Sequence, residues 1–312
     1  MPASARRFSM ALVMGLSILF QSQHRADYKL EKDFSIMILR LGFAISVAAI
    51  IVPTMAGAAE LASHRAVYDM ELIEASEKSG LTGVRGRMVY EFRGSECEGY
   101  AVRFRSVAAF GSEVGEQVID QRATTFENPS EERFSFTTQT FNDNELDKEV
   151  KGEATRQADG VSVSLSQPSS QAVDLPEAFF PVSHMQDLLR RAQAGERIYK
   201  STVFDGTENG DQVLLTNIVI GDKVDQAAKS DGDSADLGPL ADGAFWPISM
   251  SYYNISRPAS GEDEPIFRLS FDLYVNGVSR DYEMDYGEFT VGQKLVELDA
   301  LETPPCKESG EK

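Results

Sequence analysis

The stretch Gly86–Val107, GRMVYEFRGSECEGYAVRFRSV, decides the fold class of this chain. It predicts two strands joined by a short turn, with Cys97 in the turn. Large apolar residues fall on every second position of both strands: Met88, Tyr90, Phe92, Tyr100, Val102 and Phe104. Successive side chains of a strand point to opposite faces, so one face of this hairpin is apolar and the other carries most of the charges. The stretch therefore predicts a β-hairpin that covers a core on one side.

The same alternation recurs along the chain. Further strands are expected at 64–75, 114–126, 133–141, 148–158, 161–165, 198–204, 213–220, 248–255, 267–275, 278–286 and 295–301. Asp159-Gly160 and Asn276-Gly277 are favoured two-residue hairpin turns. The segment 213–220 is nearly continuously apolar, so we expect it to be buried on both faces. The pattern predicts an all-β protein built on a long antiparallel sheet.

One segment breaks this pattern. After the apolar connector Leu175–Pro181, apolar residues in 182–194 recur at steps of three and four, and Gly195 follows as a stop signal. This spacing predicts one main amphipathic helix at about 182–194. We expect it to pack on the concave side of a curved sheet.

The N-terminal region has the layout of an export signal. Arg40, the apolar run Leu41–Val52 and the small residues Ala56-Gly57-Ala58 follow one another in that order. A membrane anchor is the alternative, but the run is shorter than the ~20 residues that a spanning helix needs, and it ends near Pro53. We expect residues 1–58 to be absent from the mature protein, with Met37 as the true start and the residues before it as a gene-model artefact. A first membrane segment at Phe8–Phe20 is the other interpretation of that extension.

Charge limits the partners of the remaining residues, 59–312. They hold 24 basic and 46 acidic side chains, a net charge of −22. Such a surface repels nucleic acid and anionic lipid headgroups. Their length fits one large β domain or two small ones, and because no linker separates two halves we expect a single domain.

The chain has two cysteines, Cys97 and Cys306, which lie 209 positions apart. In an exported chain two cysteines most simply form one disulfide, with two free thiols as the alternative. No C-x-x-C spacing indicates redox catalysis.

No motif indicates catalysis, a metal or a cofactor. Ser183, His184 and Asp187 superficially resemble a hydrolase triad, but neighbours on one helix rarely converge on a reacting atom, and no G-x-S-x-G motif is present. Asp205-x-Thr207-x-Asn209-Gly210 copies half of a calcium loop, but Thr216 stands where glutamate is required. We interpret this segment, and that of Asp231, Asp233 and Asp236, as solvated turns.

Aromatic and apolar residues around the helix offer a better functional candidate. We expect an apolar cleft, for a lipid, an acyl chain or an apolar segment of a partner, lined by Phe179, Phe180, Met185, Leu188, Leu189, Trp246, Tyr252 and Tyr253. The alternative is that these residues fill the core of a curved sheet.

Several stretches resemble the EipB-like family of bacterial cell-envelope integrity proteins. They are His64–Asp69, Gly86–Phe92, Cys97–Tyr100, Phe180–His184 and Phe245–Tyr252, together with Cys306. The resemblance implies a periplasmic protein of an alphaproteobacterium that helps the cell resist envelope stress. It also implies a sheet wound as an open spiral around helical segments, similar to lipoprotein-carrier folds, with a Cys97–Cys306 disulfide. A periplasmic tetratricopeptide-repeat protein is implied as a partner, and no catalytic residue carries over.

These observations support three hypotheses. The first is a non-enzymatic periplasmic scaffold or binding protein that maintains the envelope. The second is a periplasmic carrier of lipid or lipoprotein, and the third is a hydrolase that uses His184. The sequence does not indicate an oligomeric state.

Overall fold

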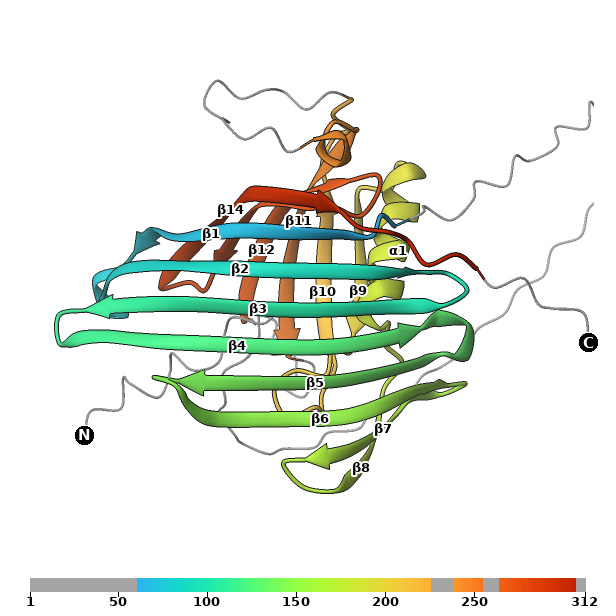
Figure 1. The fold of residues 1–312 in the computed structure, drawn as a ribbon, viewed down its shortest axis with the longest axis horizontal. Helices are drawn as coiled ribbons and strands as arrows, with labels where there is room; N and C mark the ends of the chain where they lie inside the picture. The colour runs from blue at the N-terminus through green and yellow to red at the C-terminus, as the bar shows by residue number, and fades with distance from the viewer. Residues whose placement is uncertain (1–60, 226–237, 255–263, 307–312) are drawn as a thin grey trace, which may run out of the picture. The chain divides into compact units, whose positions relative to one another are not determined.

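The computed structural model describes residues 61–225, 238–254 and 264–306. In these residues the main features are one antiparallel sheet of fourteen strands and one α-helix (Figure 1). The predicted export signal and the extension before Met37 lie outside the described residues. No helix in the described ranges combines the length and the hydropathy that a membrane crossing requires.

The described part of the chain forms eight strands before the helix and six after it. The first eight are β1 (His64–Ala75), β2 (Leu81–Ser95), β3 (Gly99–Ser112), β4 (Gly115–Asn128), β5 (Arg133–Asn142), β6 (Glu145–Gln157), β7 (Gly160–Gln167) and β8 (Gln171–Leu175). After α1 (Pro181–Gln193) come β9 (Ile198–Val203), β10 (Leu214–Ile220), β11 (Phe245–Asn254), β12 (Phe267–Tyr274), β13 (Ser279–Asp285) and β14 (Phe289–Ala300). Short 3-10 turns are η2 (Glu77–Ser79), η3 (Pro129–Glu131) and η4 (Pro239–Ala241).

Strand order places the beginning and the end of the fold side by side. Within each half of the sheet every strand pairs with its neighbour in sequence, and β1 pairs with β14. The two halves, β1–β8 and β9–β14, therefore meet in mid-sheet, and β8 and β9 form the outer edges.

The hairpin predicted around Cys97 is present as β2 and β3. Phe92 lies opposite Val102 and Tyr90 lies opposite Phe104, so all four side chains share one face. Three of them are buried, and Tyr90 is half-buried. Alternation in the sequence thus defines the inner face of the sheet correctly.

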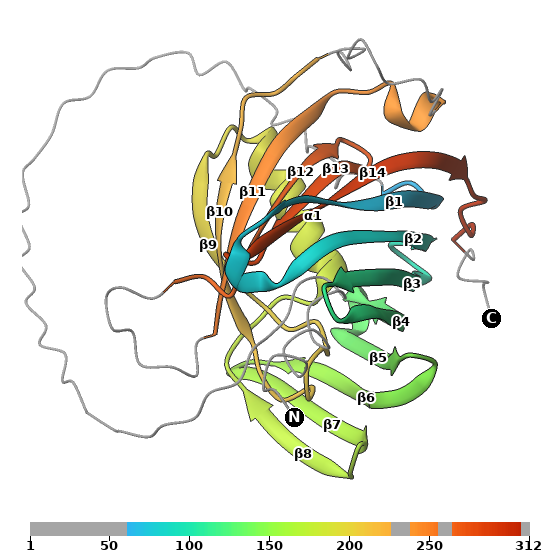
Figure 2. The same cartoon turned by 90° about the vertical axis from the view of Figure 1, so that its left-hand side faces the viewer.

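The sheet is strongly curled. Figures 1 and 2 show β9–β12 lying behind the long strands β1–β4, with α1 between the two halves. One apolar cluster joins Phe92 of β2, Leu188 and Leu189 of α1, and Ile218 of β10. The prediction of a curled antiparallel sheet with its helix on the concave side is confirmed.

A second contact between the halves comes from the segment that joins β9 to β10. Phe204 packs edge-on against Phe136 of β5, with ring centroids 5.6 Å apart. Gly206 has a φ of 70° and lies directly over the Phe136 ring, where a Cβ atom would be only 2.4 Å from the ring carbon Cγ. Glycine is therefore required at the place where the second half closes onto the first.

The segment before the helix covers part of the β9 edge. The Phe179 N–H donates to the Thr202 carbonyl, and the Phe204 N–H donates to the Phe179 carbonyl, each over 2.9 Å. These contacts form a short parallel bridge that fixes the entry into α1.

Two expectations were wrong in detail. Strand β8 was not expected, because its largely exposed residues show little apolar alternation. Strand β10 is buried on one face only. Val219, on its outer face, is 48% exposed. The continuous apolar run in the sequence therefore reflects apolar side chains on a solvent-facing surface, not burial on both faces.

Candidate functional site

A cavity of about 180 Å³ lies between α1 and the inner face of the sheet. Both halves of the sheet contribute to its wall: β1–β5 from the first half, and the end of β9 with β11–β14 from the second. One water molecule needs about 10–15 Å³ of such space. The concave side of the sheet is therefore hollow, not packed solid.

The wall is mainly apolar and aromatic. Four methionines contribute to it: Met88, Met185, Met250 and Met284. The aromatic wall residues are Tyr68, Tyr90, Phe92, Phe104, Tyr252, Phe271 and Tyr282. Methionine is flexible and polarisable, so a wall with several methionines adapts to ligands of different shape. A concave, mostly apolar site with a few polar groups is the usual form of a small-molecule site.

The polar part of the wall is small and carries little charge. The His64 ring nitrogen Nδ1 lies 2.7 Å from the Ala62 carbonyl, and burial lowers the pKa of His64, so the ring is neutral at pH 7. Gln293 donates from its side-chain amide to the Met284 sulfur over 3.1 Å. Among the described residues that line the cavity there is no lysine and no arginine.

Asp205 is the one acidic residue among the described residues of this wall. It lies two residues after the end of β9, and its Oδ1 accepts hydrogen bonds from the Thr207 N–H at 3.0 Å and the Thr207 hydroxyl at 2.6 Å. Burial raises the pKa of the Asp205 carboxyl to about 6, although the two hydrogen bonds from Thr207 and one from the Asp205 backbone oppose the rise. This segment was expected to be a solvated turn, but Gly206, Thr207 and Gly210 are buried. The packing of the segment against β5–β7 explains the difference.

The helix forms one side of the cavity. The wall residues of α1 are Pro181, Val182, His184, Met185 and Leu188, which share one face of the helix. Its N-terminus is held by Glu127 of β4, whose carboxylate accepts from the N–H groups of Val182 at 2.7 Å and Ser183 at 2.8 Å. These N–H groups have no partner within the helix, so a buried side chain from the sheet replaces the usual cap.

Ser183, His184 and Asp187 do not act on one another as a triad would. The Ser183 hydroxyl donates to Glu127, and Asp187 is bound by Arg190 and Arg191 of the same helix. Burial lowers the pKa of His184 to about 4, and its Nε2 has no hydrogen-bond partner among the described residues. Ser183 and His184 therefore do not form the hydroxyl–imidazole pair of a hydrolase triad.

Comparisons with known proteins place this fold and cavity in a family. The model of the EipB-like family matches residues 55–302. The chain belongs to the EipB-like family. It is 42% identical to the cell envelope integrity protein EipB of Brucella abortus (strain 2308) over 249 residues, which is 80% of this chain and 87% of that protein.

A solved structure supports the same family assignment. The crystal structure of a beta-barrel-like protein of a domain of unknown function from Brucella abortus is similar to this EipB-like chain, with a TM-score of 0.72 and 41% sequence identity. The match covers 78% of this chain and 99% of the other.

The EipB-like structure brings three of the eight predicted cleft residues together. Met185, Leu188 and Tyr252 line the cavity. The other five lie elsewhere. Phe180 stacks on Phe134 in a separate cluster, and Leu189 of α1 and Trp246 of β11 are buried in the same apolar core cluster. Phe179 lies under the Arg156 guanidinium. Tyr253 is half-buried and follows the buried Tyr252, so it points to the outer face of β11.

Cys97 and Cys306 form a disulfide, with their Cα atoms 5.6 Å apart. It ties the segment after β14 to the turn between β2 and β3. Because β14 already lies beside β1 and β1 beside β2, the two cysteines are brought near each other by the strand order. The pairing expected from the sequence is present in the structure.

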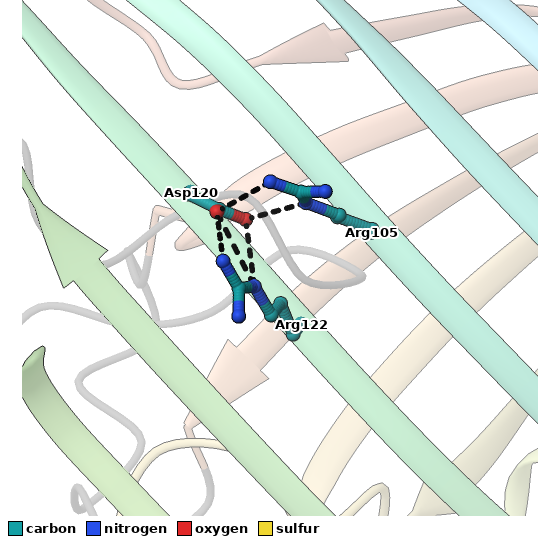
Figure 3. A network of polar contacts seen from close by, with 3 residues as sticks. All are labelled: Arg105, Asp120 and Arg122. Atoms are coloured by element: carbon teal, nitrogen blue, oxygen red, sulfur yellow. Dashed lines mark hydrogen bonds and ion pairs between the residues drawn. The ribbon is translucent and has the colours of Figure 1, made fainter. Parts of the chain in front are cut away.

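The outer face of the first half carries a polar network. Asp120 of β4 binds both Arg105 of β3 and Arg122, as Figure 3 shows, with distances of 2.9 and 2.7 Å to the two Nη2 atoms. Burial alone acts to raise the pKa of the Asp120 carboxyl, but the hydrogen bonds from Arg122 and Arg105 hold it below its ordinary value. The network lies on the opposite face from the cavity, so it stabilises the sheet and contributes nothing to the candidate site.

Several wall residues were not recognised from the sequence. The alternation in the sequence places four of them on the apolar faces of strands: Met88, Tyr90, Tyr282 and Met284. They line one cavity because these faces lie on the inside of a sheet that closes on itself. Asp205 gave no such signal. Only the closure of the sheet places its carboxyl in the cavity wall.

Proposed function

We propose that this EipB-like protein helps to maintain the cell envelope as a binding protein without catalytic activity, and that its cavity holds an apolar ligand. The observation that carries the proposal is the hollow, methionine- and aromatic-lined cavity between α1 and the sheet. The envelope role rests on the 42% identity to a protein named for cell envelope integrity.

A location outside the cytoplasm, in the periplasm, is part of the proposal. The Cys97–Cys306 disulfide supports it, because structural disulfides persist in oxidising compartments. The signal expected before residue 59 supports it as well. Mass spectrometry of the mature N-terminus tests this part: a start near residue 59 is expected, and an intact residue 1 or 37 would contradict export with cleavage.

The cavity also favours a second candidate function, a periplasmic carrier of lipid or of the acyl chain of a lipoprotein. A carrier must release its ligand, and a wall made of flexible methionine side chains suits repeated loading and release. Transfer of a fluorescent lipid between two vesicle populations separates the two: a carrier accelerates the transfer, and a protein that only retains its ligand does not.

Native mass spectrometry of the protein purified from an envelope fraction tests ligand binding. A retained apolar molecule is expected as an added mass that denaturation releases. Protein that is empty when isolated and takes up no lipid from added vesicles would overturn the proposed ligand.

The absence of catalysis is tested with Ser183→Ala and His184→Ala. In a strain that lacks the gene, each folded variant should restore growth under detergent stress as well as the wild type does. A folded variant that fails to restore growth would favour the hydrolase. The same strain allows the tetratricopeptide-repeat partner, which the family resemblance implies, to be sought by affinity capture and confirmed by reciprocal capture.

A further inference from the structure

Asp205 is a largely buried acid without a counter-ion. Its Oδ1 accepts both hydrogen bonds from Thr207, and among the described residues no lysine, arginine or histidine acts on the carboxyl as a charge partner. The nearest acidic neighbour in the segment, Glu208, has its own partner, because its carboxylate lies 3.6 Å from the Lys148 amine of β6. Asp205 therefore presents a carboxyl to the cavity that the protein itself does not neutralise.

A buried carboxylate without a counter-ion disfavours the folded state. Buried charges in proteins are ordinarily paired, because an apolar environment does not replace the hydration free energy that a carboxylate loses when it leaves water. Both hydrogen bonds from Thr207 go to Oδ1, and the only further donor to this carboxyl among the described residues is the backbone N–H of Asp205 itself, which carries no charge. An acid with raised pKa in the wall of a mostly apolar cavity is a typical mark of a functional site.

The remainder of the wall determines which ligand the carboxyl suits. Without lysine or arginine among the described wall residues, a fatty-acid carboxylate or a phosphate would meet Asp205 with no positive charge to neutralise it. A primary ammonium group supplies the missing counter-ion and hydrogen-bond donors, and the methionine and aromatic wall receives an alkyl chain. A metal ion is a poor alternative, since the described residues contain no group of three potential metal ligands.

We propose that the cavity binds a cationic amphiphile, with an alkyl or acyl chain against the methionine and aromatic wall and an ammonium headgroup bound by Asp205. This inference rests on the proposed function, because it names the ligand class of the same cavity. Asp205 is then a specificity-determining residue that contacts the ligand headgroup directly.

The test compares three ligands of equal chain length: dodecylamine, dodecanoic acid and 1-dodecanol. Each is titrated, below its micellar concentration at pH 7.5, against the wild type, Asp205→Asn and the matched control Asp211→Asn, by displacement of a fluorescent apolar probe. The amide oxygen introduced by Asp205→Asn can still accept hydrogen bonds from Thr207, so this variant should retain the fold. Asp211 lies in the same segment but is exposed.

The wild type is expected to bind dodecylamine at least about tenfold more tightly than dodecanoic acid, a difference of about 1.4 kcal/mol. Asp205→Asn should lose that preference and keep its affinity for dodecanol, and Asp211→Asn should behave as the wild type.

Equal affinity of the wild type for the three ligands would overturn the role of Asp205, and this result does not depend on any variant. The proposed apolar-ligand function of the cavity would still stand. An equal loss of affinity for all three ligands in Asp205→Asn would also show that Asp205 does not select the headgroup. If none of the three binds to the wild type, the proposed function fails together with this inference.

Discussion

The carboxylate of Glu127 in β4 lies 2.8 Å from the backbone nitrogen of Ser183, which follows 56 residues later at the start of α1. This contact connects the first half of the sheet to the one helix among the described residues, and with the hydrogen bond to Val182 it holds the helix in the cavity wall. Burial raises the pKa of Glu127, while the Ser183 and Val182 donors act against the rise.

Glu127→Ala is therefore expected to destabilise the protein by about 2–4 kcal/mol, because two buried N–H groups and a hydroxyl lose their acceptor. Urea unfolding measures the loss. The matched control is Glu131→Ala in the exposed turn η3, which should change stability by less than about 0.5 kcal/mol. Equal unfolding midpoints for the two variants would show that Glu127 does not anchor the helix.

Closure of the second half onto the first depends on Gly206. Gly206→Ala places a methyl group against the Phe136 ring and should cost about 2 kcal/mol or more. Gly195→Ala is the control, because Gly195 also has a positive φ (79°) but no atom within 4 Å of the added Cβ, so only the backbone penalty of about 1 kcal/mol applies. Similar losses for both variants would mean that the ring contact is unimportant.

The pair formed by Glu208 and Lys148 predicts a dependence of stability on pH. Burial is the largest influence on Glu208 and raises its pKa from 4.5 to about 7, although Lys148 favours the charged form. The folded state thus binds a proton more tightly than the unfolded state does. This contribution to stability is fully present below pH 4.5 and is lost as the pH rises through about 7.

Glu208→Gln should remove this loss and stabilise the protein at pH 8 relative to the wild type by about 1–3 kcal/mol, with little effect at pH 4.5. Urea unfolding of both proteins at a series of pH values provides the measurement, with exposed Glu145→Gln as the control. If the difference in free energy of unfolding between the wild type and Glu208→Gln stays constant from pH 4.5 to 8, the raised pKa of Glu208 is contradicted.

The Cys97–Cys306 disulfide is expected to stabilise the fold mainly through the unfolded chain. It closes a loop with a sequence separation of 209, for which the chain-entropy model gives roughly 5 kcal/mol. Reduction should lower the melting temperature, and Cys97→Ser with Cys306→Ser should match the reduced wild type. An unchanged melting temperature after complete reduction would show that the bridge does not stabilise the fold.

The fold was largely predictable because alternation in strands is a local signal. Residues 64–75 and the β2–β3 hairpin were located correctly, and α1 was placed within one residue at each end. The apolar run of β10 was misleading, because sequence alone does not distinguish Val219 on an exposed face from a buried valine.

The cavity was only partly predictable, because its wall depends on which inner-face residues the curl of the sheet brings together. Met185 and Leu188 were found from the helix pattern, whereas Phe180 packs in a separate cluster with Phe134 and Trp246 packs in the core. Asp205 required knowledge of how the β9–β10 segment closes onto β5, a contact between residues about 70 positions apart that no local pattern encodes.

The hollow inner face is the central claim, and a binding titration with a fluorescent apolar probe, N-phenyl-1-naphthylamine, tests it most directly. Ala123 of β4 lines the cavity, so Ala123→Phe should fill part of it, and Ala101→Phe on the exposed face of β3 is the matched control. We predict saturable binding to the wild type and to Ala101→Phe, and at least about tenfold weaker binding to Ala123→Phe, equivalent to about 1.4 kcal/mol. Binding that is absent from the wild type, or equally strong in a folded Ala123→Phe variant, would contradict a ligand-binding cavity.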